Sequence, residues 1–284
     1  MGERHSQPTK GKTARSQCTQ AQTASRAGFG GISGFELGAD GKAFVAISDT
    51  GLIYRGALQR DSADLITDAT LSRADKLMFE NGGYPDKKRN RDTEGLAISP
   101  SGTTFISAES KTRLLTYAAG KPNAQIRTLP KLDPKTPTNM GFEALALSQE
   151  GHLFAIAEGS PNIRAPFRLY KRDGSGEWQA IFDLKRSGGF RPVGADFGPD
   201  AHLYVLTRAF NGFGFASRIV RVRFENAKPV AQENIYASRF GQFDNLEGLS
   251  VWSATPNDLR VYAISDDNFN RAQTTQIVEF RAHE

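Results

Sequence analysis

The stretch Asp92-Thr93-Glu94-Gly95-Leu96-Ala97 is the clearest copy of a short block that returns along the chain. Each copy begins a predicted strand, which reaches a turn rich in Gly, Asp or Asn and returns as a second strand. The copies recur about every 50 residues with four short strands in each unit, and such a repeat is typical of a β-propeller. The other copies are Ile32-Ser33-Gly34-Phe35, Phe142-Glu143-Ala144-Leu145, Gly194-Ala195-Asp196-Phe197 and Leu246-Glu247-Gly248-Leu249.

The segments between the blocks also favour an all-β chain. Short strand-like segments alternate with turns, and no long stretch has the period of an amphipathic helix. We therefore predict a single β-propeller with five four-stranded blades, and a sixth, degenerate blade stays an alternative. The last unit lacks an outer strand, which a segment near the N-terminus could supply to close the ring.

The first 27 residues differ in composition from the rest of the chain. They are rich in Ser, Thr, Gln, Lys and Arg and contain no apolar run. We therefore predict a disordered leader over residues 1–27 and the propeller domain over residues 28–284. A secretory signal needs an apolar segment of about 7–15 residues, and none is visible. Either the protein stays inside the cell, or this sequence starts elsewhere than the natural precursor does.

Pairs of acidic residues flank the predicted hairpin turns at equal distances. Residues equidistant from the turn of an antiparallel hairpin face one another, so each pair should meet at the end away from its turn. The first strand of each propeller blade lines the central channel, and these side chains should therefore converge on one channel mouth. The pairs are Glu94 with Glu109, Glu143 with Glu158 and Glu247 with Asp266, and Asp196 with Arg208 fits more loosely.

So many carboxylates at one mouth need a compensating charge. Two carboxylates about 4 Å apart repel by about 4 kcal/mol at an effective dielectric near 20, so a metal ion, paired arginines or protonation must offset them. Oxygen ligands without cysteine or nearby histidine favour a hard cation, and Ca²⁺ before Mg²⁺ because calcium tolerates irregular coordination. In the alternative interpretation, these acids bind backbone amides and hold one blade to the next. The expected calcium ligands are Glu94, Glu143, Glu247 and Asp266.

Further polar residues near the predicted mouth are candidates for chemistry on an anionic substrate. A carboxylate such as Asp267 or Glu109 would act as general base toward a metal-bound water. The guanidinium groups of Arg208 and Arg271 would neutralise negative charge on such a substrate. The candidate substrate-binding residues are Arg91, Arg113, Asn268 and Asn270, and Asp92 and Asn245 lie nearby without an assigned role.

The composition excludes several classes of function. The single cysteine, Cys18, can form no internal disulfide and cannot build a zinc cluster. The four histidines lie near the termini or at the end opposite the acids, which argues against a Ser-His-Asp triad at the mouth. A net charge of +5 without a stripe of basic and aromatic residues gives no sign of nucleic-acid binding. No segment has the roughly 20 apolar residues of a membrane span.

The repeated blocks resemble those of the phytase-like family, described as esterase-like activity of phytase. The resemblance covers roughly residues 30–280, and its most specific part is Ile264-Ser265-Asp266-Asp267-Asn268-Phe269-Asn270 with the following Gln273-Thr274-Thr275-Gln276. It implies a bacterial β-propeller, commonly exported, with phosphoester hydrolysis similar to that of calcium-dependent propeller phytases. Blade four departs from the family pattern, because Thr207 stands beside Arg208 where members often carry an acid. The positions that match the pattern are Glu94, Glu143, Glu247, Asp266, Asp267 and Asn268.

We therefore expect a calcium-dependent hydrolase that acts as a monomer on a small phosphorylated anion at the channel mouth, without nucleic acid. From the resemblance we expect a periplasmic or secreted protein. One alternative is a propeller hydrolase of another ester class, such as a lactonase or carboxylesterase, which would turn over lactones or carboxyl esters but not phosphates. The other is a non-catalytic ligand-binding propeller, which calcium would stabilise without any turnover.

Overall fold

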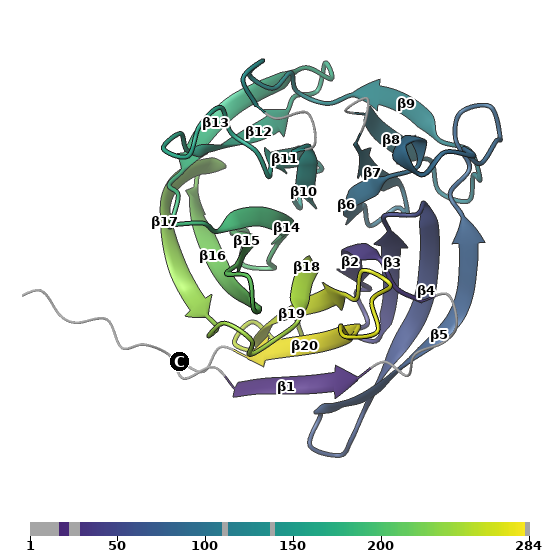
Figure 1. Ribbon diagram of the computed structural model, residues 1–284, viewed down its shortest axis with the longest axis vertical. Coiled ribbons are helices and arrows are strands. Elements are labelled where there is room, and N and C mark those ends of the chain that lie inside the picture. The colour runs from purple at the N-terminus through teal and green to yellow at the C-terminus, as the bar shows by residue number, and fades with distance from the viewer. Residues whose placement is uncertain (1–16, 23–28, 110–112, 137–139, 282–284) are drawn as a thin grey trace, which may run out of the picture.

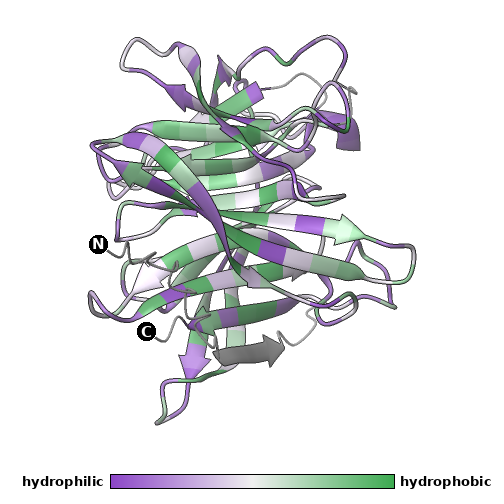
Figure 2. Ribbon diagram, turned by 90° about the vertical axis from the view of Figure 1, so that its left-hand side faces the viewer, coloured by the Kyte–Doolittle hydropathy of each residue, from purple (hydrophilic) through white to green (hydrophobic). Residues whose placement is uncertain are grey.

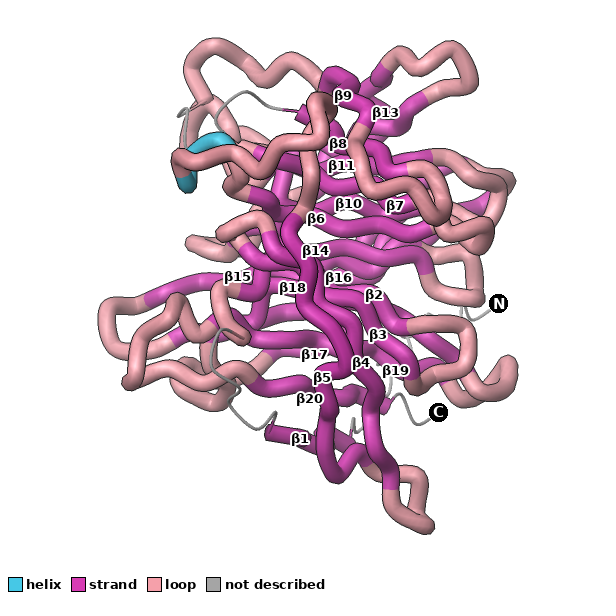
Figure 3. Tube along the Cα trace, turned by 90° about the vertical axis from the view of Figure 1, so that its right-hand side faces the viewer, coloured by secondary structure: helices cyan, strands magenta, loops and turns pink. Residues whose placement is uncertain are grey.

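Five sheets of four antiparallel strands surround a central axis in the computed structural model of the chain (Figure 1). The structure describes residues 17–22, 29–109, 113–136 and 140–281. Within these ranges the helical structure is limited to one short 3₁₀ helix, η1 (Lys88–Asn90), as Figure 3 shows. None of the helical structure described is long and apolar enough to cross a membrane. The predicted all-β propeller with five four-stranded blades is confirmed.

The blades follow one another along the chain, and each is a meander that runs from the axis outward. Blade 1 contains β2 (Ile32–Leu37), β3 (Ala43–Ser48), β4 (Leu52–Arg60) and β5 (Ile66–Lys76). Blade 2 contains β6 (Thr93–Ile98), β7 (Thr104–Ala108), β8 (Arg113–Tyr117) and β9 (Gln125–Thr128). Blade 3 contains β10 (Phe142–Leu147), β11 (Leu153–Ala157), β12 (Phe167–Arg172) and β13 (Trp178–Leu184). Blade 4 contains β14 (Arg191–Phe197), β15 (Leu203–Phe210), β16 (Phe215–Glu225) and β17 (Lys228–Ala237).

Blade 5 joins the two ends of the chain. It contains β18 (Asn245–Ser253), β19 (Leu259–Asp266) and β20 (Gln276–Arg281), and its outer strand is β1 (Gln17–Gln22). Strand β1 pairs antiparallel with β20 over its full length, so a segment near the N-terminus completes the last blade as the sequence suggested. This strand lies inside the segment expected to be a disordered leader, so the propeller includes residues before Gly28. The other residues of that leader lie outside the described ranges.

The core lies between the blades, where inner strands of neighbouring sheets face one another. Every residue of β11 is buried, whereas the outer strand β17 has no buried residue, so burial falls from the axis outward. Leu206 of blade 4, for example, packs in one cluster with Leu249 and Ala263 of blade 5. Figure 2 shows hydrophobic residues concentrated within the strands and hydrophilic ones toward the loops. Burial of these interblade faces is the main stabilising contribution, and it holds the inner strands rigidly around the channel.

Candidate active site at the channel mouth

The innermost strand of every blade has an irregular pairing at the same place, near its first residue. In four blades the register with the second strand skips one residue, and in β6 it skips the two residues between Thr93 and Leu96. A bulge of this kind re-aims a side chain that would otherwise follow the regular alternation of the strand. The residues at the bulges are Ser33, Glu94 with Gly95, Glu143, Val193 and Glu247.

This register corrects the predicted cross-strand pairs. Glu109 and Glu158 lie opposite Asp92 and Gly141, and not opposite Glu94 and Glu143. Asp196 pairs with Tyr204, three residues beyond the bulge, so the blade 4 equivalent of Glu94 is Val193 and not Asp196. In blade 5 the partner of Asp266 is Asn245 and not Glu247. The prediction paired residues by counting outward from the turn. An extra residue at the bulge shifts the cross-strand partner of every residue between the bulge and the start of the strand.

The glycine that follows the bulge explains the Glu-Gly pair of the repeated block. A Cβ atom on Gly95 would lie 2.7 Å from the carbonyl oxygen of Glu143, and one on Gly194 would lie 2.5 Å from that of Glu247. Both distances are shorter than a non-bonded carbon–oxygen contact allows. Glycine therefore lets the backbone of one blade approach the bulge of the next, and this contact positions the neighbouring acid.

The bulge glutamates of blades 2, 3 and 5 affect one another at a single mouth. Burial, followed by the charges of Glu247 and Glu109, raises the pKa of Glu94 well above its ordinary value. Burial also raises the pKa of Glu143, and Glu158 and then Glu94 add the largest charge effects. Burial and the charge of Glu247 raise the pKa of Asp266 to about 8. The structure thus brings the predicted acids together, and they cannot all ionise without a counter-charge.

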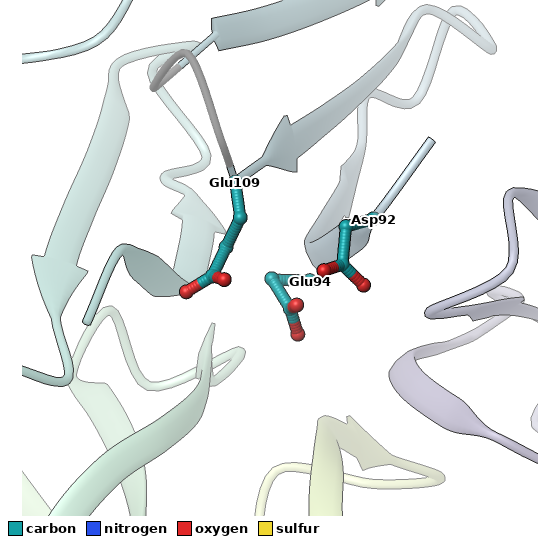
Figure 4. Close-up of side chains that lie close together, drawn as sticks. All are labelled: Asp92, Glu94 and Glu109. Carbon is teal, nitrogen blue, oxygen red and sulfur yellow. The ribbon is translucent and has the colours of Figure 1, made fainter. Parts of the chain in front are cut away.

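The tightest group of acids belongs to blade 2. Asp92 precedes β6, Glu94 lies at its bulge, and Glu109 follows β7. One carboxylate oxygen from each lies within 4.8 Å of the others, and Figure 4 shows the three side chains gathered together. Burial raises the pKa of all three, and the charge of Lys88 opposes this at Asp92 without outweighing it. Glu109 Oε1 also accepts the N–H of Gly141 at 3.1 Å, which fixes its orientation.

Asp92 is the member of this group to which the sequence analysis gave no role. The signal was present, because Asp92 stands two residues before Glu94 in the repeated block. The backbone N–H of Glu109 donates to the carbonyl of Asp92 at 2.9 Å, so the two residues face each other across the ladder. We refer below to Asp92, Glu94 and Glu109 as the blade 2 cluster.

Arg208 of β15 supplies positive charge on the other side of the mouth. Its guanidinium donates to Glu247 Oε1 and to Asn245 Oδ1. It also lies 3.8 Å from Glu158 Oε1, and Arg191 lies 3.6 Å from the same oxygen. Burial acts to lower the pKa of Arg208, but the carboxylates, Glu247 first, raise it above its ordinary value, so the side chain stays charged. Acids of blades 3 and 5 therefore have a cationic partner, and Arg191 is a member of the site that sequence reasoning missed.

The loop after β19 carries four of the predicted site residues, and its contacts are mainly structural. Asp267 Oδ1 accepts the N–H groups of Gly31 and Phe269 at 3.1 and 3.0 Å. Asn268 donates from its side chain to Gln273 Oε1 at 3.2 Å. The contacts of Asp267 match the alternative in which acids hold one blade to the next, because Gly31 precedes blade 1. The remaining two residues, Asn270 and Arg271, are exposed in this loop.

Two of the predicted substrate-binding residues support the segment that leads into β6. Arg91 donates to the carbonyl oxygens of Pro85 and Asp86 at 2.7 and 2.6 Å. Arg113 donates to the carbonyl oxygen of Asn90 at 2.7 Å. Both guanidinium groups thereby hold the segment that carries Asp92.

The fold and the mouth define a β-propeller with a carboxylate-rich site, and comparison with known families makes the assignment more specific. The model of the phytase-like family, described as esterase-like activity of phytase, matches residues 27–269. The chain therefore belongs to the phytase-like family. A search of the curated proteins gave no match.

Solved structures with a similar fold are distant in sequence. The PQQ-bound aldose sugar dehydrogenase from Streptomyces coelicolor has a TM-score of 0.50 and 14% identity, over 95% of this chain and 99% of that chain. A gluconolactonase from Xanthomonas campestris has a TM-score of 0.48 and 14% identity, over 89% of this chain and 86% of that chain. At this identity the first likeness shows the propeller fold alone. Family membership, together with the fold, supports a hydrolase built on a propeller.

Proposed function

We propose that the protein is a calcium-dependent phosphoester hydrolase whose reaction takes place at the channel mouth. The observation that carries the proposal is the blade 2 cluster, in which three carboxylate oxygens lie within 4.8 Å of one another. Acids of blades 3 and 5 contact Arg208, whereas no ion pair within the described part of the chain involves the cluster. The negative charge that no ion pair offsets therefore lies where a cation would be bound. Membership of a family described by the esterase-like activity of phytase supports the type of reaction.

The chemistry of the donors fits calcium better than other common metals. Asp92, Glu94 and Glu109 offer only carboxylate oxygens, and hard cations prefer such ligands. Calcium takes about six to eight oxygens in irregular arrangements, so carboxylates that bind through one or both oxygens, together with water and substrate oxygens, would complete its coordination. When bound there, calcium would polarise a phosphoryl oxygen and make a water molecule easier to deprotonate.

Glu143 is the best-placed proton acceptor. The charges of Glu158, Glu94 and Glu247 raise its pKa, and the charge of Arg208 lowers it. Glu143 therefore lies between the blade 2 cluster and the arginine. Its raised pKa makes it a stronger base than an exposed glutamate. Water would add to phosphorus while Glu143 takes its proton and the bond from phosphorus to the ester oxygen breaks. Glu143 would then return that proton to the departing alkoxide, which leaves as an alcohol and restores the carboxylate.

Arg208 would stabilise the negative charge that develops on the phosphoryl oxygens. It is held by Glu247 and Asn245, so its orientation is set before a substrate arrives. A preorganised donor of this kind needs little rearrangement in the transition state, which is where electrostatic stabilisation is most effective.

The test begins with protein stripped of metal by EGTA and assayed on p-nitrophenyl phosphate and inositol hexakisphosphate, with calcium added back. We expect activity only with calcium. The expected loss in kcat is at least about 100-fold both for Glu143→Gln, which removes the general base, and for Glu94→Gln, which removes a calcium ligand. Glu150→Gln is the matched control, because Glu150 is exposed at the opposite end of the hairpin that carries Glu143. Full turnover by both test variants would refute the assignment.

The same assay separates the other candidate functions. Turnover of p-nitrophenyl acetate or a lactone, but not of phosphates, would identify a carboxyl ester hydrolase. That candidate is favoured by one observation, since Arg208 is already bound to Glu247 and Asn245 and has fewer free donors for a phosphoryl group. If calcium raises the melting temperature but no ester is cleaved, the site is a non-catalytic binding site.

A further inference from the structure

We propose that the substrate carries an aromatic or similarly bulky apolar group, which packs on a patch of phenylalanines beside the mouth. The proposal rests on the function proposed above, because it adds a subsite to the same site. We define the phenylalanine patch as Phe210, Phe213, Phe215 and Phe240, which belong to two neighbouring loops of blade 4 and their flanking strands.

The patch lies at the mouth end of blade 4. Arg208 precedes the end of β15, and the turn that follows leads from Phe210 to Phe215, the first residue of β16. Phe240 lies in the next loop at this end, between β17 and β18. The N–H of Gly241 donates to the carbonyl of Phe215 at 2.8 Å, so the two loops lie against each other. The four rings therefore belong to one local surface.

The exposure of these rings is unusual for a residue type that is normally buried. Phe210 is 60% exposed, Phe213 is 99% exposed and Phe240 is 48% exposed. Isolated exposed apolar residues need no explanation, but a group of them beside a polar site is typical of a binding surface. Phe213 stands at the tip of its hairpin, where a polar residue would serve the turn equally well.

The patch is continuous with the site. The Arg208 guanidinium lies 5.7 Å from the centre of the Phe215 ring, and the Phe215 ring lies 4.8 Å from that of Phe210. A substrate whose phosphoryl group contacts Arg208 would therefore extend its ester group along these rings. Phe215 also contributes to holding Arg208, through the attraction between a cation and an aromatic face.

The apolar surface of the patch favours the same class of substrate. A polyphosphorylated polyol has little apolar surface, so it would gain nothing from exposed phenyl rings. A phosphomonoester of an aromatic alcohol places its single phosphoryl group near Arg208 and buries apolar area on the patch. We therefore infer selectivity for esters of bulky apolar alcohols over inositol phosphates.

The test compares phenyl phosphate with 4-biphenylyl phosphate, whose leaving groups are similar in acidity but differ by one ring. If half of the second ring is buried on the patch, kcat/KM should favour the biphenylyl ester by about tenfold. The double variant Phe210→Ser/Phe213→Ser should bring that ratio close to one. Val230→Ser is the control and should keep the wild-type ratio, because Val230 is exposed on β17 near the end opposite the mouth.

A binding measurement keeps this inference separate from the proposed hydrolysis. Calorimetric titration with phenylphosphonate and 4-biphenylylphosphonate needs no turnover, and it should show the same tenfold preference and its loss in the double variant. Preference without turnover would support the patch and refute the hydrolase, whereas turnover with equal efficiency on both esters would refute the patch alone. If the double variant does not fold, Phe213→Ser serves instead, because its exposed ring makes it the safest position to change.

Discussion

Replacement of Glu36 by glutamine should make the folded protein less sensitive to rising pH. Glu36 and Asp196 each lie three residues beyond the bulge of their strand, and both contact the hydroxyl of Ser250, at 3.3 and 3.2 Å. The same hydroxyl oxygen accepts the N–H of Leu37 at 3.0 Å, and Asp196 accepts the N–H of Val251 at 2.7 Å. A hydroxyl has one proton to donate. All these bonds are satisfied together when Glu36 is protonated and donates to Ser250, which in turn donates to Asp196.

The pKa values of the pair agree with this arrangement. Burial, followed by the charge of Asp196, raises the pKa of Glu36 well above its ordinary value, and burial raises the pKa of Asp196 to about 7. Acids with a raised pKa in the folded state stabilise it fully below their unfolded pKa, near pH 4, and this stability is lost as the pH rises through the folded values. Two carboxylates that share a hydroxyl lie roughly 5 Å apart, which corresponds to about 3 kcal/mol of repulsion at an effective dielectric near 20.

Glutamine reproduces the protonated glutamic acid, because its amide can donate to Ser250 and its carbonyl can accept the N–H of Ile98 that Glu36 accepts. Glu36→Gln should therefore match the wild type near pH 4.5 and exceed it by up to about 3 kcal/mol near pH 9. Urea denaturation at both pH values measures the difference, and Glu150→Gln at an exposed turn controls for the loss of a charge elsewhere. A difference between variant and wild type that is the same at both pH values would refute the shared-proton interpretation.

Three further predictions test the bulges and the mouth. Gly194→Ala should destabilise the fold by about 2 kcal/mol in urea denaturation, because its Cβ would lie 2.5 Å from the carbonyl oxygen of Glu247; a neutral effect would contradict the close approach of the two blades. Arg208→Met should lower the free energy of unfolding by about 3 kcal/mol at pH 8, where it leaves a buried charge on Glu247. The loss should be smaller at pH 5, where Glu247 can take up a proton. The melting temperature at each pH measures this. EGTA should lower the melting temperature at pH 8 but hardly at pH 5, because protons compete with calcium for the blade 2 cluster; equal shifts would argue against a cation site there.

The fold could be predicted from the sequence because each blade repeats a local pattern. The blocks around Glu94, Glu143 and Glu247 recur at a nearly constant spacing, and short hairpins make strand order within a blade follow chain order. Closure of the ring was also foreseen in outline, since the last unit lacked an outer strand. Its source, β1, lies in a stretch of polar composition, and pairing with β20 overrides the low intrinsic tendency of that stretch to form structure.

The register at the mouth could not be predicted in the same way. A bulge adds a residue on one strand without any change in composition, so Asp196 looked equivalent to Glu94 although Val193 holds that position. Burial and long-range contacts are similarly absent from the local pattern. The hydrogen bond from the N–H of Gly31 to Asp267, for example, joins residues from opposite ends of the chain, and it gives a predicted base a structural contact.

The distribution of charge around the channel explains why one blade holds the proposed cation site. Blades 2, 3 and 5 each place a glutamate at the bulge, whereas blade 4 places Val193 there and contributes Arg208 from its second strand. That arginine reaches Glu247 on one neighbour and Glu158 on the other, so it offsets the acids of blades 5 and 3. Blade 2 is not next to blade 4 in the ring, and its cluster lies beyond the arginine's reach. Ser33 occupies the bulge in blade 1, so two of the five bulge positions carry no acid. The excess of negative charge therefore lies on blade 2, which also adds a third acid, Asp92, and this asymmetry favours a single cation site over a ring of equivalent ones.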